Sequence, residues 1–181
     1  MPRPLRAFDD GFFHLAAHAS DTRYLFVSDR DRNNFLELLA LIFTRHELVA
    51  VAYTLMGNHY HLILYTPDAR VSRAMQQLHT GYSRRHNRKY GRSAHLFRAH
   101  FGAREITSDE QLLAAARYLA LNPVEAGLAR HPLAWRWSSA RVHAGLARAR
   151  VPLDESPLRT AFDNNADWRQ SYRRLIETKS A

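Results

Sequence analysis

Cysteine is absent from the 181 residues, so the chain can form no disulfide, thiolate zinc site or cysteine nucleophile. No uninterrupted apolar run approaches the roughly 18 residues of a membrane-spanning helix. The first residues lack the apolar stretch of a signal peptide. Hydrophobic residues nevertheless make up 46% of the chain, so we expect a globular protein of the cytoplasm.

Acidic residues are missing from one internal stretch. None occurs between Ala69 and Arg104, where nine cations stand. The whole chain has 26 Lys and Arg against 17 Asp and Glu, for a net charge of +9, so this stretch carries the entire excess. A merely solvated surface would mix both signs, and an acid-free run therefore indicates contact with a polyanion such as nucleic acid. The cations that we expect to contact phosphates are Arg73, Arg84, Arg85, Arg88, Lys89, Arg92 and Arg98.

The spacing of apolar residues predicts the element order β-α-β-β-α-β-α. Strands are expected over residues 11–19, 48–56, 59–66 and 96–106, and helices after Ser28, Pro67 and Ser108. The helix after Ser108 should end near Asn122, where Pro123 would stop it. This order is typical of an α+β, ferredoxin-like (split βαβ) antiparallel sheet with helices on one face.

The remaining sequence predicts an appendage to this domain. Residues 124–146 are rich in aromatic side chains and should pack back on the sheet domain. Residues 147–157 look like a linker, and residues 163–176 have the spacing of a short amphipathic helix. We therefore expect one domain over residues 1–146, followed by a linker and helical tail over residues 147–181.

Two histidines stand one residue apart at the start of an expected strand. Side chains alternate along a strand, so His59 and His61 project from the same face. Two adjacent imidazoles can bind one divalent metal ion. They can equally be ordinary surface or packing residues, because histidine is common in this chain, with 11 copies.

A tyrosine and an asparagine share one face of the expected helix after Ser108. Tyr118 and Asn122 are four residues apart, which places them one turn from each other. A tyrosine on a Leu- and Ala-rich helix is usually a core residue. It can also be the nucleophile of phosphodiester cleavage, with a metal polarising the phosphate and Asn122 adding a neutral oxygen ligand.

Four passages carry the motifs of one known family: Gly11–His14, Asp29–Leu39, Leu55–Leu62 and Arg117–Leu128. Trp137-Ser138-Ser139 follows them in that family's order, and Tyr60 stands between the two histidines at a position that is usually aliphatic there. In these passages the chain resembles the HUH-type transposases of single-stranded DNA that use a single tyrosine, most of all the REP-associated tyrosine transposases.

The resemblance implies a function as well as the ferredoxin-like fold. Tyr118 would be the catalytic residue, attacking a single-stranded DNA phosphate to leave a 5′-phosphotyrosine and a free 3′-OH. His59, His61 and Asn122 would hold Mg²⁺ or Mn²⁺. The partner would be hairpin DNA, such as a REP-like palindrome, bound by a cytoplasmic, nucleoid-associated monomer or homodimer.

Two other functions fit part of the sequence. A non-catalytic nucleic-acid-binding module with a ferredoxin-like, RRM-like fold would explain the basic stretch without the paired histidines. A zinc hydrolase acting on a small substrate would use the histidines, but such sites usually have three strong protein ligands.

Overall fold

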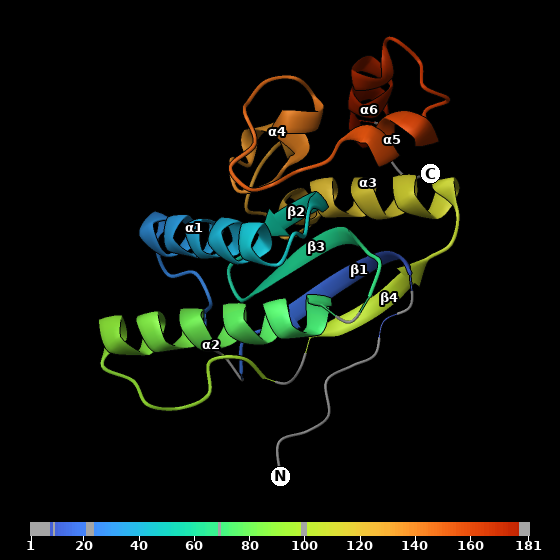
Figure 1. Ribbon diagram of the computed structural model, residues 1–181. Helices are drawn as coiled ribbons and strands as arrows, with labels where there is room; N and C mark the ends of the chain where they lie inside the picture. Colours follow the sequence, from blue (N-terminus) through green and yellow to red (C-terminus); the bar gives the residue numbers. More distant parts are fainter. Residues whose placement is uncertain (1–7, 9, 21–23, 69, 99–100, 178–181) are drawn as a thin grey trace.

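Four antiparallel strands form the central sheet of the computed structural model, in the order β2-β3-β1-β4 (Figure 1). The model describes residues 8, 10–20, 24–68, 70–98 and 101–177. The strands are β1 (Gly11–His18), β2 (Ala50–Leu55), β3 (His59–Thr66) and β4 (Gly102–Ile106). Because β1 lies between β3 and β4, the sheet has the split βαβ arrangement, and the expected ferredoxin-like α+β fold is confirmed.

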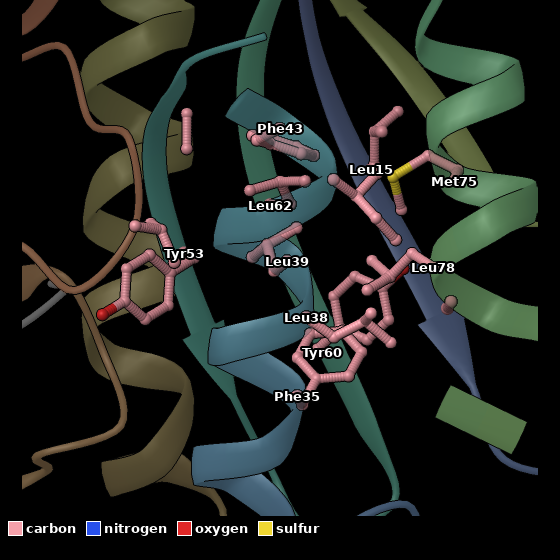
Figure 2. Packing of buried hydrophobic residues seen from close by; sticks show 14 of the residues in the cluster. Leu15, Phe35, Leu38, Leu39, Phe43, Tyr53, Tyr60, Leu62, Met75 and Leu78 are labelled. Atoms are coloured by element: carbon pink, nitrogen blue, oxygen red, sulfur yellow. The ribbon is translucent and has the colours of Figure 1, made fainter. Parts of the chain in front are cut away.

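One face of the sheet is covered by α1 (Asp29–Arg45) and α2 (Arg70–Tyr90). Figure 2 shows their apolar side chains meeting those of β1 and β3 between the helices and the sheet. On α1, the Ser28 cap and Asp31 form the two halves of a capping box, which fixes where the helix begins. The core residues labelled in Figure 2 include Leu15, Phe35, Leu39, Leu62, Met75 and Leu78.

The opposite face of the sheet is covered by α3 (Asp109–Glu125), with α5 (Ser156–Ala161) and α6 (Trp168–Glu177) packed outside it. The expectation of helices on one face only is therefore wrong. All six residues of β2 are buried, because Val51 points to the α3 side while Tyr53 joins the core on the other. Strands buried on both faces read as nearly continuous apolar runs.

Pro123 lies inside α3 rather than ending it, so this expectation is also wrong. The proline falls in the last helical turn, where its missing N–H removes a single hydrogen bond. The helix continues past the proline to Glu125, and the N–H of the next residue, Ala126, donates to the carbonyl of Asn122 at 3.0 Å. Asn122 consequently keeps its place on the same helical face as Tyr118.

The segment after α3 packs on the outer edge of β2. It contains a short 3₁₀ turn, η1 (Pro132–Ala134), and α4 (Ala140–His143). Trp137 is buried, and its carbonyl accepts a hydrogen bond from the N–H of Leu55 at 2.9 Å. The expected packing of residues 124–146 is confirmed.

Part of the expected linker is paired with the sheet. The N–H of Ala50 donates to the carbonyl of Pro152 at 2.9 Å, and the N–H of Asp154 donates to the carbonyl of Ala50 at 2.8 Å. The end of the linker starts α5, a helix that the sequence reading did not include. The boundary at residue 146 stays a prediction.

The last strand is shorter than expected, since β4 spans only Gly102–Ile106. Phe97 forms an isolated bridge to Ala19, and residues 99–100 of the expected strand lie outside the described residues. Among the helices that the structure describes, none has the length and apolar character needed to cross a membrane.

Candidate functional site

A cluster of four histidines occupies the α3 face of the sheet. His59 and His61 of β3 have ring centroids 5.0 Å apart, which confirms that they share a face. Strand β1 adds His14, whose Nε2 lies 2.9 Å from Nδ1 of His61. It also adds His18, whose ring stacks on that of His59 with centroids 4.8 Å apart. The predicted pair is thus half of a larger site.

The sequence reading did not select His14 and His18 as site residues. They are four apart on β1 and therefore project from the same face. The register of the sheet places His18 directly opposite His59, and Ala16 opposite His61. The spacing alone indicates that His14 and His18 share a face, but only the register of β1 against β3 shows that they lie next to His59 and His61.

Helix α3 brings Tyr118 and Asn122 to the histidines. The Tyr118 ring lies 5.2 Å from the His61 ring, centroid to centroid, and 6.0 Å from that of His14. The tyrosine is 42% exposed, so it is not a core residue. Asn122 is buried and hydrogen-bonds His59. Tyr118, Asn122, His59 and His61 therefore meet at one place.

The environment lowers the pKa of both predicted metal-binding histidines, His59 and His61, which favours their neutral form. Burial and the neighbouring histidines lower the pKa of His61 to about 3. Burial likewise lowers the pKa of His59, with His18 adding to the effect and the hydrogen bond that His59 donates to the Asn122 side chain opposing it. Neutral imidazoles keep a nitrogen lone pair, which is the form that binds metal ions.

One buried nitrogen of this cluster has no partner. Nδ1 of His61 is engaged by His14, while its Nε2 is buried without a hydrogen bond. Nδ1 of His59 lies 2.8 Å from Oδ1 of Asn58, which fixes that ring. A buried unpaired nitrogen is costly unless a ligand takes it.

The donor set matches a cation held by two imidazoles and an amide oxygen. Among the described residues, no group of three or more His, Cys, Asp or Glu side chains is placed to hold a metal. A third protein ligand for a metal ion would therefore come from another side chain, and Asn122 is in contact with His59. His59, His61 and Asn122 fit a divalent ion in this way, and the match rests on the orphaned Nε2 of His61.

The elements that carry the site are tied to the rest of the fold. The guanidinium of Arg32 donates to the carbonyl of Met56 at 3.4 Å, just before the turn into β3. The N–H of Ala19 donates to the carbonyl of Asn58 within that turn at 2.7 Å. On α3, Arg117 donates to the carbonyl of Leu175 in α6 at 3.0 Å. The histidines and Tyr118 thus stand on anchored backbone.

Six of the seven expected phosphate-binding cations are exposed on α2 or the loop that follows it and, in the described part of the chain, form no ion pair. The N–H of Arg98 donates to the carbonyl of His18 at 3.0 Å, so the loop reaches the histidine cluster. The six are Arg73, Arg84, Arg85, Arg88, Arg92 and Arg98.

Lys89 has a partner inside the protein. Its Nζ lies 2.6 Å from Oδ1 of Asp31, whose side chain is only 3% exposed, and it also donates to Ser28 Oγ at 3.1 Å. The carboxylate accepts a further hydrogen bond from the Tyr90 hydroxyl at 2.7 Å. Lys89 therefore serves as the counter-ion of a buried acid.

The chain is similar to known proteins over much of its length. A family model described as "Transposase IS200 like" matches residues 11–122, from the first residue of β1 to Asn122. A search of the curated proteins finds no match. A solved structure described as the REP-associated tyrosine transposase bound to a REP hairpin is similar, with a TM-score of 0.65 and 16% identity. The similarity covers 86% of this chain and 93% of that one.

The family match shows that the chain is an enzyme of the transposase class. The family match extends over more than half of the chain and includes both histidines and the tyrosine. The chain belongs to the IS200-like transposase family. The resemblance expected from the sequence motifs is confirmed, and the enzyme reading stands in place of a non-catalytic module.

Proposed function

We propose that this transposase is a metal-dependent endonuclease and strand transferase of single-stranded DNA that recognises DNA hairpins. The observation that carries the proposal is the meeting of an exposed tyrosine with a two-histidine, one-amide donor set: Tyr118 lies against His61 while Asn122 contacts His59. The protein of similar fold was solved bound to a REP hairpin, which supports hairpin DNA as the ligand.

The chemistry assigned to Tyr118 is transfer of a phosphoryl group. Its hydroxyl oxygen attacks the scissile phosphorus, a bond forms between tyrosine and the 5′ phosphate, and the bond from phosphorus to O3′ breaks. The proton lost by the phenol is balanced by the proton gained at the released 3′-OH. Attack by a 3′-OH of another strand end on the phosphotyrosine reverses these bonds and joins the two strands.

His59, His61 and Asn122 would hold Mg²⁺ or Mn²⁺ beside the scissile phosphate. When bound, the ion supplies a Lewis acid that polarises the phosphate. Two imidazole ligands favour Mn²⁺ over Mg²⁺ in intrinsic affinity. The protein's own contribution is to keep both rings neutral and oriented, through burial, His14 and Asn58.

The hairpin would lie against the cations of α2 and its following loop. Exposed guanidinium groups without an internal partner can take phosphates at little desolvation cost. Arg84, Arg85, Arg88 and Arg92 cluster in the last turns of α2 and just beyond it, and Arg73 and Arg98 extend the same charge. Lys89 is assigned to Asp31 rather than to DNA in this proposal.

A denaturing gel tests the proposed chemistry. Labelled hairpin DNA with flanking single strands, made from palindromic repeats beside the gene, is incubated with protein with and without Mn²⁺. We expect a Mn²⁺-dependent covalent protein–DNA band that is lost in Tyr118→Phe. Tyr65→Phe is the matched control, because Tyr65 is 41% exposed and lies on β3, the strand that carries His59 and His61, and it should keep the band. A band that persists in Tyr118→Phe would overturn the assignment.

A further inference from the structure

A groove runs along α3 from the catalytic tyrosine toward the start of the helix. Its volume is about 640 Å³. Tyr118 and His14 lie at one end and Gln111 toward the other, between α3 and the strands β1 and β4. Much of its wall is made of residues with little or no side chain. These are Ala16, Gly102, Ala103, Ala114 and Ala115.

One cation of the acid-free stretch enters this groove. Arg104 pairs directly with His14 across β1 and β4, so both side chains stand on the α3 face. Arg104 lines the groove and is exposed. Its positive charge also helps to lower the pKa of His14, after the larger effect of burial.

Two cations of the acid-free stretch, Arg70 and Arg104, are not among the seven expected to contact phosphates, and of these two only Arg104 is available to a ligand. Arg70 is held by Asp68 and Glu47, at 2.8 Å and 3.1 Å. Within the described residues, Arg104 forms no ion pair. A free guanidinium beside an exposed tyrosine nucleophile is suited to a phosphate.

We propose that the groove is a nucleotide subsite, in which Arg104 binds the phosphate next to the one that Tyr118 attacks and the alanine-lined walls receive the base. The inference rests on the proposed function and names where the cleaved strand lies. The volume falls within the roughly 300–1,000 Å³ of small-ligand pockets. Small side chains on both walls leave room for a flat ring between helix and sheet, and the polar side chains of His14, Gln111 and Tyr118 line the same groove.

Binding measurements in the Tyr118→Phe background test the subsite without cleavage. One probe is a hairpin from the repeats beside the gene, and the other is the same hairpin with short single-stranded extensions. We expect the extensions to tighten binding. Ala115→Trp, which fills the groove, and Arg104→Gln should each remove roughly tenfold of that gain and leave the affinity for the bare hairpin unchanged. Arg104→Lys should keep part of the gain.

Two controls match the bulk and the charge of these substitutions. Ala147→Trp adds the same side chain at an exposed loop position, and Arg159→Gln removes an exposed cation on α5. Neither should alter the gain from the extensions. Extensions that add nothing, or a gain kept by both groove variants, would overturn the subsite alone. Failure of the protein to bind either probe would instead overturn the proposed function.

Discussion

Nε2 of His14 lies 2.9 Å from Nδ1 of His61, in a hydrogen bond between two neighbouring strands of the sheet. This contact occupies one nitrogen of His61 and leaves Nε2 as the only ring atom that can bind a ligand. It also fixes the orientation of the ring. In the proposed function, His14 is therefore a positioning residue for His61, one of the three proposed metal ligands.

Replacing His14 should weaken metal binding at a distance. Hydrogen-bond partners of metal-binding histidines typically contribute 10- to 100-fold to metal affinity. We expect His14→Phe to lower the affinity of the metal-free protein for Mn²⁺ by about that factor, measured by titration calorimetry, while His14→Gln, which keeps a polar partner, loses less. His18→Phe is the comparison, since His18 stacks on His59. Equal losses in the His14 and His18 variants would contradict a specific role for the hydrogen bond.

Two neighbouring cations of α2 should behave differently when replaced. Lys89→Met leaves the buried Asp31 without its ion-pair partner, so the free energy of unfolding should fall by about 2 kcal/mol. Arg88 is exposed and has no such partner in the described chain, so Arg88→Met should weaken DNA binding and leave stability unchanged. Urea unfolding and fluorescence anisotropy with hairpin DNA separate the two effects. A destabilised Arg88→Met would show that its guanidinium has a structural role.

Salt dependence should report the phosphate contacts at the end of α2. Each phosphate contact contributes close to 0.9 to the slope of log affinity against log salt on duplex DNA. The double variant Arg84→Gln/Arg85→Gln should lower the slope for hairpin binding by about 2, with weaker binding at low salt. Arg159→Gln on α5 should leave the slope as it is. An unchanged slope in the double variant would move the binding face away from α2.

The C-terminal helices are tied to α4 by a partly buried network that should weaken in acid. Glu155 accepts hydrogen bonds from Arg169, at 2.9 Å and 2.7 Å, and contacts the fully buried His143 at 3.2 Å. Burial alone would raise the pKa of Glu155, but the hydrogen bonds from His143 and Arg169 outweigh it and lower the pKa to about 2. Burial lowers the pKa of His143 despite the nearby carboxylate.

Both shifts make the unfolded chain bind protons more readily than the folded one, so stability falls as pH falls. The contribution of His143 is lost below its ordinary value of 6.5, and that of Glu155 between 4.5 and about 2. We expect the melting temperature to decrease over this range. Glu155→Gln should be less stable than the unsubstituted protein at pH 7, and the difference should shrink toward pH 3. A constant difference would contradict the assigned pKa of Glu155.

Features of the fold that depend on local sequence could be predicted. The limits of β3 follow from alternation after the turn at Gly57, and the starts of α1 and α3 from their serine caps. The placement of α3 could not, because it depends on which strands offer a second apolar face. Val51 and Ile63 do so only once β2 and β3 are paired, and neither stands out in the sequence.

The same division applies to the site. His59 and His61 share a face because of their spacing, and Tyr118 and Asn122 because of theirs. His14 and Arg104 could not be placed from spacing, since each depends on the register of β1 against β3 or β4. Lys89 was grouped with its neighbours by charge, but its role depends on Asp31, which is 58 positions away in the chain.

The sheet separates the basic helix α2 from the tyrosine on α3, and the loop through Arg98 joins the two sides beside His18 (Figure 1). A DNA molecule that contacts both sides must turn around the end of the sheet within a few nucleotides. Duplex DNA stays straight over about 150 base pairs, whereas a single strand bends freely. A hairpin bound along α2 would have to end in unpaired nucleotides at this corner, so the enzyme would select its cleavage point by flexibility as well as by base sequence.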